Sequence, residues 1–410
     1  MNNNIISLLK VPGFWVTDVR ITGEEIIVSV RKRSKTARCP TCLKRTKKLK
    51  DHLREIKVLH LMLCNQRVYL SLRKRRFNCL SCQKVFIEQL SFLPRYQRRS
   101  IFASRHALER LTDTSFHATT KRLGISYGSL SSLLKKVFRL DDLNWEMQKV
   151  EKVIRLGIDE HHFGRNNKYL VTIANLLTGK PIQILSNDKQ ATLVSFLKNL
   201  PGEAKEAVDE VCIDMKRSFL NAVLKELPKA RVVIDHFHII QDANKRVNDA
   251  RKIEDDVEEK IRGNGSKRIP WKLLTRNKEN LKERQFDLVN YYLNRYPAVS
   301  IFYACKEKLR DMYQAESKEE AEQILTGLIR FMKTSEYPEL WRWAKTLSFW
   351  QPYILNYFDN HTTNATTEGL HRKFKLIQRQ AYGFRNPEVY ARRILLACLP
   401  LPFLLPQHLT

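Results

Sequence analysis

Two aspartates stand where apolar strands are expected to end. Asp159 closes the segment VIRLGID (153–159), and Asp214 directly follows the segment Glu210–Ile213. A single aspartate at such a place is ordinarily a turn or helix-cap residue, but two neighbouring carboxylates repel each other unless a proton or a cation lies between them. The pair therefore indicates a metal site or a proton-sharing dyad. Two magnesium ions roughly 4 Å apart can activate an attacking oxygen and stabilise the leaving oxygen of a phosphodiester, with a third carboxylate supplied by a later element.

The strands that would position these aspartates follow one another in a defined order. The expected elements are strands at Val153–Asp159, Tyr169–Asn175 and Pro181–Leu185, a helix at Lys189–Leu200, a strand at Glu210–Ile213, a helix at Phe219–Leu227 and a strand at Ala230–Ile234. Short connections predict an antiparallel meander for the first three strands, and the alternating helices add parallel members. This order is typical of a ribonuclease-H-like sheet. Its first and fourth strands are central neighbours, so Asp159 and Asp214 are expected side by side.

Four of the eight cysteines form two identical Cys-x-x-Cys pairs, Cys39 with Cys42 and Cys79 with Cys82, separated by 36 residues. Two such knuckles complete a tetrahedral zinc site. The alternative of four unrelated core residues is disfavoured by the duplicated spacing. Between the pairs, Arg67–Asn78 alternates apolar and polar residues before it becomes basic, as the second limb of a zinc ribbon would. The sequence therefore predicts one structural zinc ion.

The segment Ser115–Phe138 resembles two short amphipathic helices around a tight turn. Gly124 stands where a left-handed cap would end the first helix, and Ser126 can cap the second, Tyr127–Lys136. This pattern predicts a helix-turn-helix whose second helix enters the major groove of DNA. A plain helical hairpin is the alternative. The preceding arginines, among them Arg98 and Arg99, favour the DNA-binding interpretation.

The chain is strongly basic, because 73 Lys and Arg against 43 Asp and Glu give a net charge of +30 and a pI of about 9.9. Residues 1–150 alone hold 31 basic and 11 acidic side chains, which makes this third the stronger candidate for contact with nucleic acid. The length predicts two or three domains. No apolar run reaches the roughly 20 residues of a spanning helix, and no signal-peptide pattern opens the chain. We therefore expect a cytoplasmic, nucleoid-associated protein with no membrane partner.

Beyond residue 240 the pattern becomes helical, charged and aromatic up to about Asn356, which indicates an all-helical block inserted into the sheet domain. A further helix is expected to begin near Thr366 and carries Glu368 in its first turn. Three basic residues recur along it at helical spacing, namely Arg372, Lys375 and Arg379. One helix face would thus offer an acid followed by a phosphate-binding stripe.

These motifs together resemble the ISL3 family of bacterial insertion-sequence transposases. The resemblance is carried by CPTC, RRFNCLSC, GIDEHHFG, IDMKRSFLNAVLKELPKARVVIDHFHI and TTEGLHRKFKLIQRQAYGFRN, in this order over nearly the whole chain. It implies a zinc-binding head, a helix-turn-helix that recognises terminal inverted repeats, and a ribonuclease-H-like DDE core interrupted by helices. The implied triad is Asp159, Asp214 and Glu368. Asp235 and His238 take accessory roles, and His371 departs from the Asn expected in relatives.

The resulting expectation is a multidomain α+β protein. The expected boundaries are a zinc-ribbon head at 1–94, a helix-turn-helix at 95–140, a linker at 141–152, the first part of the core at 153–240, a helical insertion at 241–358 and the carboxyl-terminal part of the core at 359–410. The residues expected to contact DNA are Arg73, Lys74, Arg75, Arg76, Arg98, Arg99, Lys121, Arg122, Lys135, Lys136, Arg372, Lys375 and Arg379.

The expected activity is transposition by two phosphoryl transfers, hydrolysis at a transposon end and then attack by the freed 3′ hydroxyl on a second phosphodiester. Asp159 would bridge two magnesium ions, or manganese in their place, while Asp214 and Glu368 hold one each. The expected partners are double-stranded DNA, as transposon ends and target, and a second copy of the chain, with no small-molecule cofactor. Two alternatives stay open at this point: a zinc-containing transcriptional regulator, and a ribonuclease-H-fold nuclease without strand transfer.

Overall fold

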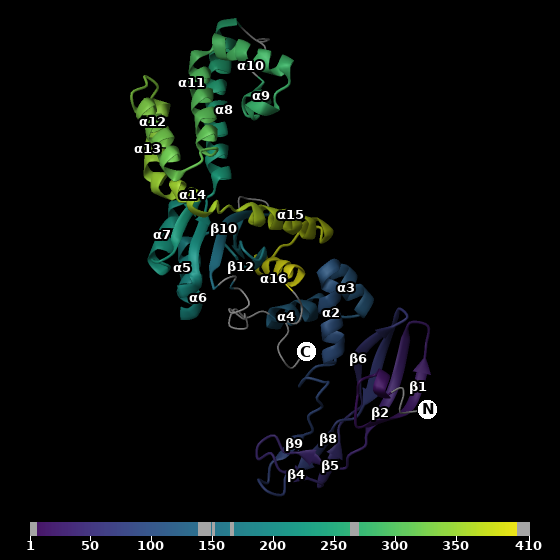
Figure 1. Ribbon diagram of the computed structural model, residues 1–410. Helices are drawn as coiled ribbons and strands as arrows, with labels where there is room; N and C mark the ends of the chain where they lie inside the picture. Colours follow the sequence, from purple (N-terminus) through teal and green to yellow (C-terminus); the bar gives the residue numbers. More distant parts are fainter. Residues whose placement is uncertain (1–5, 138–148, 150–151, 165–167, 263–269, 400–410) are drawn as a thin grey trace. The chain divides into compact units, whose positions relative to one another are not determined.

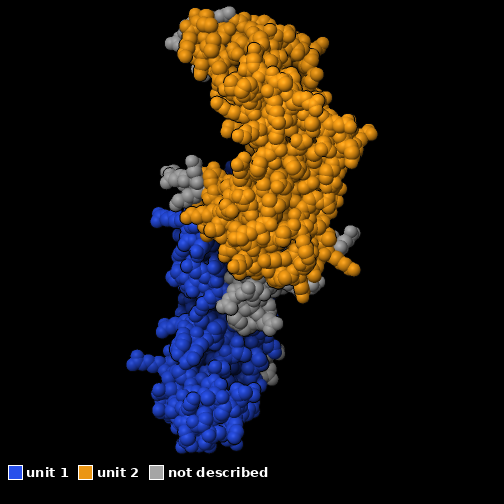
Figure 2. Space-filling model, turned by 90° about the vertical axis from the view of Figure 1, so that its left-hand side faces the viewer, with its two compact units in different colours: residues 1–143, 375–410 blue, residues 144–374 orange. Residues whose placement is uncertain are grey.

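Figure 1 shows the computed structural model of the chain, which describes residues 6–137, 149, 152–164, 168–262 and 270–399. The chain forms two compact units, residues 1–143 with 375–410 and residues 144–374 (Figure 2). Most of the expected linker at 141–152 lies outside the described residues. Each unit has its own sheets and its own hydrophobic core, and the two are described separately below.

A five-stranded mixed sheet forms the centre of the second unit. Its strands are β10 (Ile154–Phe163), β11 (Lys168–Asn175), β12 (Lys180–Leu185), β13 (Val208–Ile213) and β14 (Arg231–Ile234), in the spatial order β12-β11-β10-β13-β14. The meander β10-β11-β12 is antiparallel, whereas β13 runs parallel to both β10 and β14. Fully buried valines and isoleucines fill these strands because helices and loops cover both faces. The predicted pairing of the first and fourth strands is confirmed.

Helices α5 (Gln190–Lys198), α6 (Gly202–Ala207) and α7 (Arg217–Glu226) connect the later strands, and Figure 1 shows α5 and α7 on one side of the sheet. Strand alternation places Gly157 and Asp159 of β10 on one face, together with Glu210 of β13 and Asp214 just beyond it. That face receives the segment after residue 359 and the first turns of α15 (Ala365–Gln380).

A helical block follows β14, as predicted. It consists of α8 (His236–Arg262), α9 (Trp271–Leu274), η3 (Lys278–Asn280), α10 (Glu283–Arg295), α11 (Pro297–Met312), α12 (Lys318–Lys333), α13 (Pro338–Leu355) and α14 (Tyr357–Asn360). Its aromatic residues are partly core, because Trp343 is fully buried and stacks on Phe302 with ring centroids 6.2 Å apart. Trp271 and Trp341 are instead about half exposed.

The amino-terminal part of the first unit contains two larger sheets. Strands β1 (Phe14–Ile21), β2 (Glu25–Lys32), β7 (Gln66–Leu72) and β6 (Ile56–Leu63) form the first in that order, and β5 (Leu49–His52), β8 (Arg75–Asn78) and β9 (Val85–Ile87) form the second, beside the short pair β3 (Ala37–Arg38) and β4 (Arg45–Thr46). The expected single limb at 67–78 is therefore two strands in two different sheets. The four-stranded sheet was not predicted.

Helices α2 (Ile101–Asp113), α3 (Phe116–Leu123), α4 (Tyr127–Val137) and α16 (Pro387–Cys398) complete the first unit. Gly124 caps α3 in the left-handed conformation with φ of 63°, as the sequence indicated. Of the segment 359–410, predicted to form the carboxyl-terminal part of the core, the described residues 375–399 group with this compact unit. The physical reason is that Val389 and Leu396 of α16 complete the apolar cluster of α2, α3 and α4.

None of the helices in the described part of the chain is long and apolar enough to span a membrane.

Candidate active site and metal centres

Three side chains converge at the carboxyl ends of the central strands of the second unit. Asp159 comes from β10, Asp214 follows β13, and His238 lies in the first turn of α8 directly after β14. One potential ligand atom from each lies within 4.8 Å of the others. His238 Nε2 is 2.8 Å from Asp214 Oδ1 and 4.0 Å from Asp235 Oδ2. Asp159 and Asp214 thus lie close together, as predicted, because their strands β10 and β13 are parallel neighbours.

The electrostatics of this cluster favour a cation. Burial and the nearby charge of Asp214 raise the pKa of Asp159 to about 8. Burial alone would lower the pKa of His238, but its hydrogen bond and charge interaction with Asp214 raise that pKa to about 9. Asp235 is 1% exposed, and its Oδ2 has no hydrogen-bond partner among the described residues. Clustered carboxylate oxygens of this kind are the ligands that magnesium and manganese prefer, so the residues fit a divalent metal.

Glu368 lies in the first turn of α15 and is partly buried. It is not among the three residues that converge within 4.8 Å in the described structure. Its helical neighbours are nevertheless held against β10. A Cβ atom on Gly157 would lie 2.9 Å from Thr367 Oγ1 and 2.6 Å from Asn364 Oδ1, so only glycine permits this close approach.

The segment before α15 is anchored by a buried acid that the sequence did not single out. Glu210 is fully buried and accepts hydrogen bonds from Asn360 Nδ2 at 2.6 Å and from the Thr362 hydroxyl. Further along, Asn364 Nδ2 donates to the carbonyl of Ile158 at 3.4 Å, and its backbone N–H donates to Asp235 Oδ1 at 3.3 Å. Residues 360–364 are therefore attached to both central strands, which fixes where α15 begins.

His371 joins the site from the next turn of α15. Its Nδ1 is 3.4 Å from Asp159 Oδ2, and its Nε2 is 2.9 Å from Thr172 Oγ1. The ring of His161, two residues after Asp159, lies beside the His371 ring in a tilted arrangement, with ring centroids 5.0 Å apart. The sequence left the role of His371 open. Its position three residues after Glu368 indicates that His371 lies near the predicted acid, because residues at this spacing share a helix face.

The four predicted zinc ligands also come together, in the first unit. Cys39 Sγ is 3.6 Å from Cys82 Sγ, and Cys42 Sγ is 3.4 Å from Cys79 Sγ. Zinc–sulfur bonds of about 2.3 Å in a tetrahedron place sulfur atoms about 3.8 Å apart, close to these distances. Hydrogen bonding from the Cys42 backbone N–H lowers the pKa of Cys39 to about 6, which favours the thiolate that zinc requires. The set fits one zinc ion.

Each knuckle has the same backbone. The N–H of Cys39 donates to the carbonyl of Lys44, and the N–H of Cys79 donates to the carbonyl of Lys84, both at 2.9 Å. Leu43 and Gln83, the residues after the second cysteine of each pair, both have positive φ. The repeated Cys-x-x-Cys spacing thus encodes two copies of one turn.

Most of the basic residues expected to contact DNA are exposed. The exposed set comprises Arg73, Arg98, Lys121, Arg122, Lys135, Lys136, Arg372, Lys375 and Arg379. Lys74 is half-buried, and burial lowers its pKa. Arg76 donates to Asp51 Oδ1 at 2.7 Å through Nε, so part of its charge is neutralised within the ribbon.

Two of the expected DNA contacts have internal partners instead. Arg99 is 8% exposed and donates to Ser104 Oγ at 3.0 Å and to Ser129 Oγ at 2.7 Å, which ties α2 to α4. The Arg75 guanidinium donates two hydrogen bonds to Glu88, at 2.9 and 2.6 Å, and the backbone N–H of Arg75 donates a third at 3.0 Å. The basic residues around them in the sequence suggested contacts with DNA, whereas these hydrogen bonds hold both Arg99 and Arg75 within the first unit.

Comparison with known proteins bears on both centres. The ISL3 family described as "Transposase" matches residues 156–394, and "zinc-finger of transposase IS204/IS1001/IS1096/IS1165" matches residues 35–82. The transposase for insertion sequence element IS1001 of Bordetella parapertussis is 22% identical over 376 residues, 91% of each chain. The transposase for insertion sequence element IS1557 of Mycobacterium tuberculosis is 24% identical over 293 residues, 66% of this chain and 65% of that relative.

Proposed function

The chain belongs to the ISL3 family of insertion-sequence transposases, and from this premise we propose that it cleaves the ends of an insertion sequence and joins them to target DNA in a metal-dependent reaction. The observation that carries the proposal is the convergence of Asp159 and Asp214 from two adjacent parallel strands. The strand order β12-β11-β10-β13-β14 supports a ribonuclease-H-like core, since that fold places its catalytic acids on the same two strands.

In this proposal Asp159, Asp214 and Glu368 hold divalent metal, magnesium first. Metal bound there supplies an activated attacking oxygen and stabilises the leaving oxygen of the scissile phosphodiester. The chain itself positions these acids: Gly157 admits α15 against β10, and residues 360–364 fix the start of the helix that carries Glu368. No serine or tyrosine nucleophile is needed.

His238 and Asp235 act as accessory residues in this scheme. The 2.8 Å contact of His238 with Asp214 orients that carboxylate. The backbone N–H of Asn364 donates to Asp235, which links the end of β14 to the segment before α15. Both residues thus position groups at the site, and their loss should weaken the reaction less than loss of a metal-holding acid.

We further propose that the zinc ribbon and the helices α3 and α4 bind the terminal inverted repeats. The exposed Lys121 and Arg122 of α3, Lys135 of α4 and Arg98 before α2 supply charge for phosphate contacts. Because two transposon ends must be brought together, the active form would be a dimer or a higher oligomer on DNA.

Cleavage of a labelled duplex that carries the element's terminal repeat, in buffer with magnesium, tests the catalytic assignment. Asp159→Asn, Asp214→Asn and Glu368→Gln should each reduce cleavage by at least a hundredfold while retaining duplex binding. Asp249→Asn is the matched control, because Asp249 is an exposed carboxylate of α8 paired with Lys252. Wild-type cleavage by Asp159→Asn would disprove the assignment of that residue.

A second assay separates transposition from simple hydrolysis. Precut ends with a free 3′ hydroxyl are incubated with a target plasmid and the protein. A transposase gives joined product. A nuclease of the same fold gives only degradation, and that result would restrict the proposal to cleavage.

A further inference from the structure

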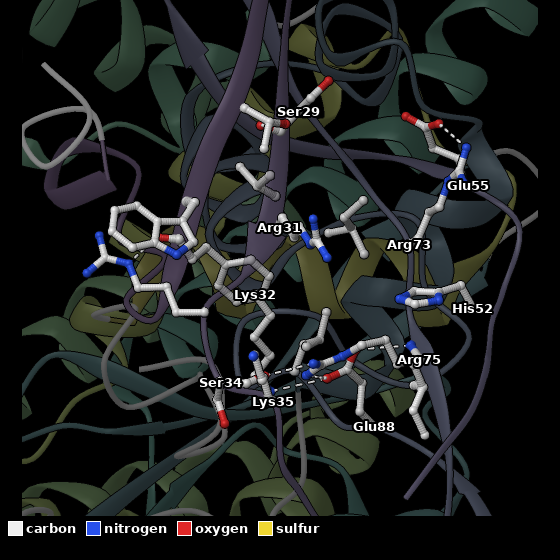
Figure 3. A pocket seen from close by; sticks show the side chains of 18 of the residues that line it. Ser29, Arg31, Lys32, Ser34, Lys35, His52, Glu55, Arg73, Arg75 and Glu88 are labelled. Atoms are coloured by element: carbon white, nitrogen blue, oxygen red, sulfur yellow. Dashed lines mark hydrogen bonds and ion pairs between the residues drawn. The ribbon is translucent and has the colours of Figure 1, made fainter. Parts of the chain in front are cut away.

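The first unit contains a cleft of about 920 Å³ that the metal centres do not use (Figure 3). Residues of β1 and β2, the turn after β2, β5, β7 and β8 line it, so its walls are the four-stranded sheet and the ribbon sheet. In Figure 3, Arg31 and Lys32 face the space from one side, while Arg73, His52 and Arg75 lie on the other.

The sheet wall is the polar face that strand alternation leaves outside the core. Val28 and Val30 of β2 point into the apolar cluster of the sheet, whereas Ser29 and Arg31 alternate with them and line the cleft. Trp15 of β1 is the register partner of Arg31 and also lines the cleft. A short side chain at Ser29 leaves room between the larger neighbours.

The charge of this lining is strongly positive. It contains seven Lys and Arg, namely Arg31, Lys32, Arg33, Lys35, Lys47, Arg73 and Arg75, against the two acids Glu55 and Glu88. Glu88 is engaged by Arg75 and Lys32, and Glu55 by Arg73. Within the described part of the chain, Arg31, Lys35 and Lys47 form no ion pair and are exposed. These three cations can therefore serve an external anion.

An aromatic surface accompanies the charge. Trp15 is 49% exposed, and the Arg33 guanidinium lies 4.0 Å from the centroid of its ring. Arg33 Nε also donates to the carbonyl of Phe14 at 2.8 Å, which fixes the stacked arrangement. An exposed indole ring in a basic groove is a suitable platform for a nucleobase, because every base can stack on an aromatic face.

We propose that this cleft binds single-stranded DNA, with phosphates at Arg31, Lys35 and Lys47 and an unpaired base against Trp15. A basic groove with an aromatic platform is how proteins hold single strands. The cleft volume is within the roughly 300–1,000 Å³ of small-ligand sites, which is room for a few nucleotides. One wall of the cleft is the ribbon sheet, which also belongs to the proposed duplex-binding surface, whereas the wall that carries Trp15 and Arg31 does not. The inference does not rest on the catalytic assignment.

Binding of a fluorescent 15-nucleotide oligothymidine to the full-length protein, followed by anisotropy, tests the proposal. Trp15→Ala should weaken binding roughly tenfold or more, whereas Trp15→Phe should retain most of the affinity. Trp271→Ala is the matched control, because Trp271 is equally exposed at 48% and lies in the other unit. Zinc content and circular dichroism establish that each variant is folded.

A second pair of variants tests the charge. Arg31→Gln combined with Lys35→Gln should weaken oligothymidine binding and reduce its salt dependence, while Arg20→Gln, an exposed arginine of β1 outside the cleft, should not. Unchanged oligothymidine binding in the cleft variants overturns the proposal. If these variants weaken the binding of duplex DNA and not of oligothymidine, the cleft contacts the backbone of a duplex instead. Asp159→Asn should bind the oligonucleotide like wild type, which separates this inference from the proposed catalysis.

Discussion

The imidazole of His371 contacts the carboxylate of Asp159, with Nδ1 3.4 Å from Oδ2. The other nitrogen of the same ring is 2.9 Å from Thr172 Oγ1, and Thr172 is the register partner of Asp159 across β10 and β11. One side chain of α15 thus links the helix that carries Glu368 to the strand pair that carries Asp159. The contact gives a structural reason for α15 and β10 to move as one piece.

Replacement of His371 by alanine should therefore lower the affinity for metal more than it lowers the free energy of unfolding. Residues that orient metal-binding carboxylates typically change metal affinity or activity by about 10–100-fold when they are lost. We expect His371→Ala to need a correspondingly higher magnesium concentration for half-maximal cleavage, with partial recovery in His371→Gln. His162→Ala, an exposed histidine on the same strand, is the control. An unaltered magnesium dependence in His371→Ala would exclude this role.

Gly157 should tolerate no larger residue. A Cβ atom there would lie 2.6 Å from Leu176 Cδ2 and from Asn364 Oδ1, so Gly157→Ala must push the start of α15 away from β10. Overpacking of this kind typically costs about 1–3 kcal/mol. We expect a lower free energy of unfolding in denaturant titration and a loss of cleavage.

The matched control for that substitution lies in α15 itself. Gly369 has no atom within 4 Å of an added Cβ, so Gly369→Ala should stabilise the helix by about 0.5–1 kcal/mol. If both glycine variants shift the unfolding midpoint in the same direction, the close contacts of Gly157 are not the reason that this position requires glycine.

Glu210→Ala should release the segment before α15. The carboxylate is fully buried and receives Asn360 and Thr362, with Arg155 Nε 3.5 Å away. Removing one partner of a buried charge pair typically costs about 3–5 kcal/mol. Hydrogen exchange at residues 360–371 should accelerate as well. The exposed pair of Glu206 and Lys229 provides the comparison, since Glu206→Ala should cost less than about 1 kcal/mol. Equal effects of the two glutamate variants would contradict the anchoring role.

Local signals were sufficient for much of the second unit. The strands around Asp159 and Asp214 were predicted because uninterrupted β-branched runs and short turns mark them, and the rules of strand connection then limit the order of the sheet. The helical pair around Gly124 was found for a similar reason, since its cap residues are visible in the sequence. Each of these features depends on residues close together in the chain.

Features that depend on distant residues were missed. The anchor at Glu210 joins residues 150 positions apart, and no local pattern distinguishes a buried, paired glutamate from an exposed one. Arg99 was expected on the DNA surface because its neighbours are basic, yet its partners Ser104 and Ser129 come from two different helices. Burial decides both cases, and burial is a property of the tertiary fold.

The four-stranded sheet of the first unit was missed for a different reason. Only Arg73 and Lys74 separate strands β7 and β8, so the alternating apolar and polar residues predict one continuous strand. Their partners differ, β2 and β6 for β7 but β5 and β9 for β8. When consecutive strands pair in different sheets, the hydrophobic periodicity of the sequence does not show it. Here the change of sheet between β7 and β8 creates the cleft lined by Trp15 and Arg31.

Loss of one of the four cysteines proposed to bind zinc should unfold the ribbon sheet while leaving the second unit intact. Cys79 is buried in the small cluster with Cys39 and Phe77, which has few other apolar contacts to stabilise it. Because metal binding and folding are coupled in such small sites, Cys79→Ser should lose one equivalent of zinc and weaken binding to both the terminal-repeat duplex and oligothymidine. Cys64→Ser, an exposed lone cysteine of the same unit, should keep its zinc. Elemental analysis and calorimetry distinguish the two variants, since only Cys79→Ser should lower the unfolding transition of the first unit. Full zinc occupancy in Cys79→Ser would mean that the four thiols are not the ligands.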